Sequence, residues 1–358
     1  MSTVFEPNYV VHPGETLAEW IEEDGMTQVE LATRIGISEK ALSQILNGVA
    51  PITPETALSL EFVTKVPART WNSLQALFAE DTSRLNRNLS LENQIDFLFT
   101  MPLSDLRKRG FVTSKRRDAV AVREVCDFFG VADPRSWAKL WTGTGVAYRK
   151  SEAFKANPES VATWLRLGEL AARSLDIGDY NKSKLKTLLP QMRSLSLEPD
   201  PSFFIPALQR LCASAGVAFV VIPEITGARC SGATRWISRK PIVQLSLRHK
   251  SDDHLWFTFF HELGHVLLHG HKSIFIEGDM KDSEDDEQET QANTFARNQL
   301  IPDRFASDLA SLKTLDSITE FAARVGVSPG IVVGRLQHDQ LIGFKVGNGL
   351  KARYRFTQ

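Results

Sequence analysis

The stretch DHLWFTFFHELGHVLLH, residues 253–269, carries the strongest signal in this chain of 358 residues. Its apolar residues recur at helical spacing, which predicts an α-helix over residues 253–268. Residues four apart on a helix share one face, so His261 and His265 can present two imidazoles to one metal ion. Glu262 lies beside them, where it can take a proton from a metal-activated water. The stretch therefore predicts a catalytic zinc site.

A catalytic zinc needs a third protein ligand and one open position. His269 continues the same spacing, but it lies two turns, about 12 Å, from His261 and cannot share the ion. The best source is a second helix, predicted over residues 284–300. There Glu289 can bind the metal, while Asn293, one turn further on, can hold a ligand histidine by its second nitrogen.

Several choices stay open around this site. Glu287 and Glu284 are alternatives to Glu289 as the third ligand. The group that would stabilise the oxyanion is not assigned, and four residues are candidates: His254, His271, Arg248 and Tyr354. Cys230 is either a buried, inert cysteine or a ligand that closes the open zinc position in a latent form.

Upstream of the metal-site helix the pattern predicts an α+β domain. A helix expected over residues 204–215 leads to an apolar run at 217–222, which Pro223 ends. A second β-type run, residues 242–247, comes directly before the metal-site helix, and the segment between the two runs is expected to be a loop. Helix, strand, loop, strand and helix in this order are typical of an α+β fold.

Three motifs in this half of the chain resemble the ImmA/IrrE family of metallo-endopeptidases: HELGHVLLH at 261–269, ExxANxFA at 289–296 and LIP at 300–302. The resemblance spans about residue 159 to the C-terminus. It implies a zincin-like, gluzincin-type domain in which His261, His265 and Glu289 hold zinc and Glu262 is the general base. It also implies a protein substrate, because relatives cleave helix-turn-helix repressors.

The N-terminal part is predicted to form a compact set of short helices over residues 12–79. Thr27 can cap one helix, Gly36 can end it, and Ser38 can cap the next. Two helices joined by a short turn that contains glycine are typical of a helix-turn-helix.

Two further motifs, HPGE at 12–15 and NGxxPIT at 47–53, make residues 11–77 resemble the HigA-type antitoxins, a branch of the XRE family. The resemblance makes residues 38–46 the recognition helix, and the partners it implies are DNA, a toxin and a second copy of the chain bound through this domain. The candidate DNA contacts, to bases or to phosphates, are Gln28, Ser38, Glu39, Lys40, Ser43 and Gln44.

The distribution of charge raises an objection to DNA binding by this domain. Residues 1–80 contain 11 Asp or Glu against 4 Lys or Arg, whereas residues 81–159 contain 10 against 14. A DNA-reading domain normally has a basic surface, so dimerisation or mimicry of a repressor is the alternative. The basic segment, residues 107–117 with Phe111 at its centre, is either a solvated connector or a second nucleic-acid contact.

An internal similarity appears near the C-terminus, where SITEFAARVGVS at 317–328 aligns with TQVELATRIGIS at 27–38 without gaps. It predicts either a second helix-turn-helix-like unit or a plain pair of packed helices. The signals together divide the chain into a helix-turn-helix domain at 1–81, a basic helical connector at 82–158, a metallopeptidase domain at 159–310 and a helix-turn-helix-like extension at 311–358.

Composition places the chain among cytoplasmic, multidomain proteins. Its hydrophobic content of 42% is sufficient for buried cores, and no stretch approaches the roughly 18 apolar residues of a membrane span. Three scattered cysteines indicate neither a disulfide framework nor a zinc knuckle. The leading hypothesis is a zinc endopeptidase that regulates transcription by cleaving a repressor, an antitoxin or itself. The alternative is a non-enzymatic DNA-binding antitoxin that keeps the peptidase fold as a scaffold or toxin-binding surface.

Overall fold

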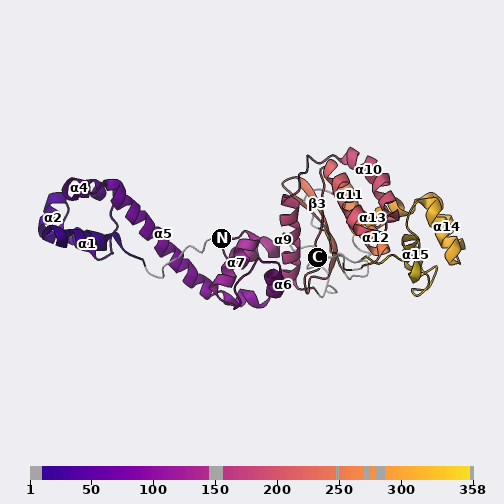
Figure 1. Cartoon of the computed structure of the whole chain (residues 1–358), viewed down its shortest axis with the longest axis horizontal. Coiled ribbons are helices and arrows are strands. Elements are labelled where there is room, and N and C mark those ends of the chain that lie inside the picture. Colours follow the sequence, from indigo (N-terminus) through magenta and orange to yellow (C-terminus); the bar gives the residue numbers. More distant parts are fainter. Residues whose placement is uncertain are drawn as a thin grey trace. The chain divides into compact units, whose positions relative to one another are not determined.

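The computed structural model describes residues 10–144, 156–246, 248, 250–269, 275–278 and 287–354 (Figure 1). The chain forms two compact units, one from Met1–Asp96 with Arg116–Val122 and the other from Phe97–Lys115 with Arg123–Gln358. The first unit is helical and the second is α+β, so the predicted fold class is confirmed. The four-part division of the chain stays a prediction, and helix α5 crosses its first boundary without a break.

Five helices build the first unit: α1 (Pro13–Asp24), α2 (Gln28–Ile35), α3 (Glu39–Leu46), α4 (Pro54–Thr64) and α5 (Ala68–Glu92). Their apolar residues form one core around the fully buried Leu31, Leu42 and Leu60. The Thr27 side chain accepts a hydrogen bond from the first turn of α2, and Ser38 does the same for α3. Gly36 ends α2 at a φ of 75°, a left-handed conformation that favours glycine. These caps set the predicted turn between the two helices.

After α5 the chain forms α6 (Leu103–Lys108), α7 (Ala119–Phe129), α8 (Pro134–Thr144), α9 (Pro158–Arg173), α10 (Lys182–Ser194) and α11 (Pro201–Ser214). The metal-site helix α12 (Asp252–Leu268), α13 (Glu287–Leu300), α14 (Leu315–Val325) and α15 (Pro329–His338) follow. Short 3-10 helices cover Ile95–Phe99, Leu195–Leu197, Asp303–Ser311 and Asn348–Leu350. No described helix is both long and apolar enough to cross a membrane.

A four-stranded sheet lies between α9 on one side and α11 and α12 on the other (Figure 1). Its strands are β1 (Ala218–Val221), β2 (Cys230–Ile237), β3 (Lys240–Leu245) and β4 (Phe275–Gly278), in the order β1-β3-β2-β4. β1 and β3 are parallel, whereas β2 is antiparallel to both of its neighbours. β2 thus occupies an inner position directly beside the metal-site helix.

Successive side chains along a strand point to opposite faces of the sheet, so the two faces carry different residues. On the α9 face, Arg235 donates to the carbonyl of Leu165 at 2.6 Å and Gln244 donates to the carbonyl of Trp164 at 2.8 Å. On the α12 face, the Thr234 hydroxyl reaches Glu262. Side chains that point toward α12 can therefore act on the metal-site helix from the sheet.

The expectation of a loop between the two apolar runs was wrong. Residues 230–237 form the inner strand β2, although Ser231, Gly232 and Ala233 have no strand preference of their own. Tertiary pairing on both edges, with β3 and β4, overrides the weak local signal. The other two predicted runs are strands, as β1 and β3.

The C-terminal similarity produces a packed pair of helices. α14 ends at Gly326 with a φ of 79°, as α2 ends at Gly36. α15, the counterpart of the recognition helix, packs on α12 and buries Ile331, Val332 and Val333. This burial removes the face of α15 that a DNA groove would have to meet.

Candidate metal centre

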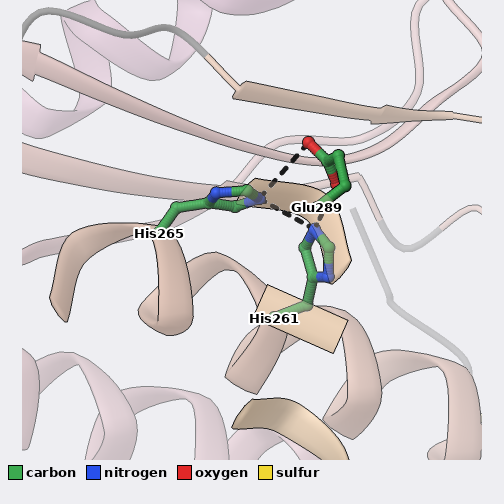
Figure 2. Close-up of side chains that lie close together, drawn as sticks. All are labelled: His261, His265 and Glu289. Atoms are coloured by element: carbon green, nitrogen blue, oxygen red, sulfur yellow. Dashed lines mark hydrogen bonds and ion pairs between the residues drawn. The ribbon is translucent and has the colours of Figure 1, made fainter. Parts of the chain in front are cut away.

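Two helices supply the side chains of the centre. α12 carries His261 and His265 one turn apart, and α13 carries Glu289 in its first turn. One ligand-type atom from each residue lies within 4.8 Å of the other two. Figure 2 shows both imidazoles turned toward the carboxylate. The structure thus brings together the three residues that the two motifs single out.

The spacing of the three donor atoms fits a tetrahedral metal ion. The Nε2 atoms of His261 and His265 are 2.9 Å apart. The Glu289 carboxylate lies 3.2 Å from Nε2 of His261 and 3.6 Å from Nε2 of His265. Two donors at 2.0–2.1 Å from a tetrahedral zinc are about 3.3 Å from each other. Donor type and separation therefore both suit such an ion.

Burial and hydrogen bonding favour the protonation states that a metal needs. Burial lowers the pKa of His265 to about 4, so its imidazole is neutral near pH 7. Burial alone would raise the pKa of Glu289, but its close contacts with His261 and His265 outweigh burial and hold that pKa well below its usual range. A neutral imidazole and an ionised carboxylate are the ligand forms of these groups.

Small residues let α13 come close enough for Glu289 to reach the histidines. A Cβ on Gly264 would lie 3.1 Å from the ring of Phe295 and 3.2 Å from the Cα of Ala292. Ala292 and Ala296 are fully buried at the same contact. The glycine of HELGH and the alanines of the second motif thus serve the packing of the two helices.

The Nδ1 atoms of His261 and His265 both have hydrogen-bond partners. Nδ1 of His261 lies 2.9 Å from Oδ1 of Asn293, the contact expected from the sequence. Nδ1 of His265 lies 2.9 Å from Nδ1 of His269, whose Nε2 is 3.3 Å from Oε1 of Gln291. An Nδ1–H that donates outward leaves the Nε2 lone pair free to face the metal. The spacing that keeps His269 off the ion places it behind His265.

Glu262 follows His261 on α12 and is fully buried. Its Oε2 accepts a hydrogen bond from the Thr234 hydroxyl at 2.6 Å. Its Oε1 lies over Gly232, where a Cβ would be only 2.5 Å away. The carboxylate is therefore held by strand β2, whereas the three candidate ligands are held by α12 and α13.

Comparison with known proteins finds a family match for two segments of the chain. Residues 220–337 match the family described as the IrrE N-terminal-like domain, and residues 17–71 match the family described as helix-turn-helix. The chain joins a helix-turn-helix domain to an IrrE-like domain. The resemblance drawn from the motifs is confirmed for both domains, and the IrrE-like match contains the whole candidate metal centre.

Two solved structures are similar to the N-terminal part. An addiction module antidote protein of the HigA family from Coxiella burnetii is 31% identical, with a TM-score of 0.22, and the match covers 23% of this chain and 91% of that chain. A proposed antidote protein of a plasmid maintenance system from Nostoc punctiforme is 23% identical, with a TM-score of 0.23, and the match covers 24% and 92%. No curated protein matches the chain.

The alternatives for the third ligand are Glu287 and Glu284. Glu287 is exposed on the first turn of α13 and accepts a hydrogen bond from Gln291 at 3.0 Å. Glu284 lies outside the described residues, as does the predicted start of this helix. Among the described residues, the metal-type cluster contains Glu289 as its carboxylate.

Three of the four candidate oxyanion donors lie among the described residues. Tyr354 is buried against Phe204, and burial raises its pKa to about 12. Arg248 lies 3.7 Å from Glu224, and His254 is on the first turn of α12. His271 lies outside the described residues.

Cys230 is held as a neutral thiol. It is buried at the start of β2, where its Sγ donates to the carbonyl of Ala228 at 3.1 Å. Burial raises the pKa of this thiol, which opposes formation of the thiolate that binds zinc. This geometry favours the inert cysteine over the latent-form ligand.

The candidate DNA contacts lie on α2, on α3 and at Ser38, the N-cap of α3, in the helix-turn-helix domain. Gln28, Glu39, Lys40 and Gln44 are exposed, and Ser43 is half-buried. Ser38 is exposed as well, but its hydroxyl accepts the amide of Ala41 as the cap of α3. In the basic segment, the Phe111 ring packs against Phe128 with ring centroids 4.7 Å apart. That packing uses the ring that would otherwise stack on a base.

Sequence reasoning missed the contribution of β2. Neither Gly232 nor Thr234 was singled out, because each acts on a helix about 30 residues away in the chain and no local spacing links them. His269 was considered only as a ligand, although its i+4 spacing from His265 was the signal for a supporting contact.

Proposed function

We propose that the chain is a zinc-dependent regulatory endopeptidase whose helix-turn-helix domain binds DNA, and that it cleaves a partner repressor or antitoxin, or itself. The observation that carries the proposal is the convergence of His261, His265 and Glu289, with Glu262 buried at the next position after His261 on the same helix. A structural zinc site is normally closed by four protein ligands, whereas three ligands leave a position for reaction.

The chemistry follows from these positions. Zinc held by the three ligands would polarise the scissile carbonyl and make a water acidic near neutral pH. Glu262 takes a proton from the attacking water as its oxygen bonds to the carbonyl carbon. It then passes the proton to the leaving amine as the C–N bond breaks. Asn293 and His269 keep the two imidazoles in the tautomer that binds metal.

The N-terminal domain supplies the regulatory context. Its match to the helix-turn-helix family supports DNA binding, with α3 in the major groove and Lys40 and Gln44 as the reading side chains. A homodimer through this domain and a toxin partner are part of the same proposal. Leu58 and Phe62, exposed one turn apart on α4, supply an apolar surface for such a contact.

The proposal is tested with the zinc-loaded full chain and the repressor encoded beside it, with fragments identified by mass spectrometry. Glu262→Gln should retain zinc and lose cleavage by about 10²–10⁴-fold, because the base is gone and the ligands are not. Glu320→Gln, a change at an exposed glutamate of α14, should cleave like the unmodified chain. Equal cleavage by both variants would contradict the assigned base.

One observation favours a second candidate, the non-enzymatic antitoxin. Glu262 is 0% exposed, while a general base must meet its water. If the fold is a scaffold, the unmodified chain binds operator DNA and zinc but cleaves neither the neighbouring repressor nor a second copy of itself. That result, obtained with zinc content verified, would replace the endopeptidase proposal.

A further inference from the structure

Strand β2 shapes the environment of Glu262 through two of its residues. Gly232 and Thr234 are two residues apart on this strand, so both face α12. Each meets a different oxygen of the Glu262 carboxylate. The strand therefore contacts the proposed base at two points, although it carries no candidate ligand.

Gly232 provides the space that the carboxylate occupies. A Cβ at this position would lie 2.5 Å from Oε1 of Glu262, 2.9 Å from its Cγ and 2.6 Å from Cγ2 of Thr258. These separations are too short for any side chain larger than hydrogen, and the neighbouring atoms are buried. The glycine thus lets the Glu262 side chain lie directly against the strand.

Thr234 provides the hydrogen bond. Its hydroxyl lies 2.6 Å from Oε2 of Glu262 and 2.9 Å from the main-chain carbonyl oxygen of the same residue. The hydroxyl has one hydrogen, and the shorter contact has the length of a charge-assisted O–H···O⁻ bond. Thr234 is fully buried, so water does not replace this donor. A rotation of the Glu262 side chain away from β2 would break the bond.

We propose that Thr234 is a positioning residue for the general base: its hydroxyl, together with the space at Gly232, fixes the orientation of the Glu262 carboxylate. This inference rests on the proposed function, because it assigns Thr234 a task in the same reaction. Thr234 touches neither the substrate nor the metal ligands in this role. It acts through Glu262, whose orientation sets how often the carboxylate is in line with its water.

The kinetic test compares three variants of the zinc-loaded full chain. Thr234→Val removes the donor at nearly constant volume, and we expect kcat to fall between about tenfold and a hundredfold with KM and zinc affinity unchanged. Thr234→Ser restores the hydroxyl and should recover kcat to within about threefold of the unmodified chain. Thr163→Val is the matched control, since Thr163 is also fully buried and donates to a helix carbonyl, that of Glu159. Equal kcat in Thr234→Val and Thr163→Val would overturn the inference.

A second readout does not depend on catalysis. Chemical unfolding of the zinc-loaded full chain is measured for Thr234→Val, Glu262→Ala and the double variant. We expect the shift in unfolding midpoint caused by Thr234→Val to shrink by at least about half when Glu262 is absent. If the midpoint shifts of the two single variants simply add in the double variant, Thr234 and Glu262 are not coupled and the inference is overturned. Coupled shifts without any cleavage by the unmodified chain would instead retain the contact and reject the endopeptidase, and with it the catalytic task of Thr234.

Discussion

His261 and His265 belong to the same motif, yet the Nδ1 atoms of their imidazoles contact different residues. Asn293 faces His261, and His269 faces His265, in both cases at 2.9 Å from Nδ1. We expect His269→Ala and Asn293→Ala each to weaken zinc binding by about 10–100-fold, because the ligand ring loses its fixed tautomer and orientation. Zinc affinity is measured by competition with a chelator of known affinity.

The same helix offers a control for this prediction. His254 is exposed on the first turn of α12, and His254→Ala removes an imidazole of identical chemistry without changing the centre. Its zinc affinity should equal that of the unmodified chain. If His269→Ala behaves like His254→Ala, the contact with His265 contributes nothing to metal binding.

Spacing along one element explains how far the centre could be predicted. His261 and His265 lie on one helix and His269 is the residue that caps its C-terminal end, so a period of 3.6 residues relates their positions without knowledge of the fold. The choice between Glu289 and Glu287 depends on how α13 is rotated against α12, which the packing at Gly264 and Ala292 decides. The role of Thr234 could not be predicted from spacing, because its position depends on how β2 pairs with its neighbouring strands.

At the scale of elements, the first turn of α1 depends on a histidine cap. Nδ1 of His12 accepts the amide of Gly14 at 2.9 Å, and its ring packs edge-on against Phe78 of α5. Burial lowers the pKa of His12, with Glu15 opposing that shift. A protonated Nδ1 cannot accept the Gly14 amide, so the cap requires the neutral ring.

The stability of the first unit therefore depends on pH through His12. The unfolded chain binds a proton at His12 more readily than the folded chain, so the stabilisation is complete above about pH 6.5 and is lost as pH falls below it. Lowering the pH from about 7 to about 5 should weaken the protection of amides in residues 10–96 by about 1 kcal/mol through this group. Hydrogen exchange corrected for intrinsic rates measures the change in the full chain.

His12→Asn is the matched variant for this prediction. Asparagine is a good N-cap and does not titrate, so the variant should keep the stability at neutral pH and lose the His12 contribution on acidification. An unchanged pH dependence in His12→Asn would assign the effect to other groups of the domain.

Strand β2 also shows where fold prediction from sequence stops. β1 and β3 are apolar runs, and α12 has a clear helical period, so each could be predicted from its own residues. In β2, the small residues at 231–233 fit between α9 and α12 and would be poor strand formers alone. Their conformation is set by neighbours on both edges, and those neighbours come from distant parts of the chain.

At the scale of the whole molecule, most basic residues of the N-terminal half lie in a different segment of the sequence from the residues expected to contact DNA. Residues 1–80 contain the helix-turn-helix but only 4 Lys or Arg against 11 Asp or Glu. Among the six candidate DNA contacts, Lys40 is the basic one. Counterion release scales with the number of phosphates that basic groups neutralise, so binding through this domain should depend weakly on salt. DNA binding through the basic segment at 107–117 would instead depend strongly on salt.

This difference yields a prediction for operator binding by the full chain. Binding to the chain's own promoter DNA is measured from about 50 to 200 mM salt, and the slope of log K against log [salt] is compared among variants. Lys40→Ala should reduce the magnitude of the slope by about one, and Gln44→Ala should change base preference while leaving the slope intact. Lys108→Ala, an exposed lysine of the basic segment, is the control and should leave both unchanged. A slope that responds to Lys108→Ala but not to Lys40→Ala would move the nucleic-acid contact from α3 to the basic segment and leave the acidic helix-turn-helix for binding protein.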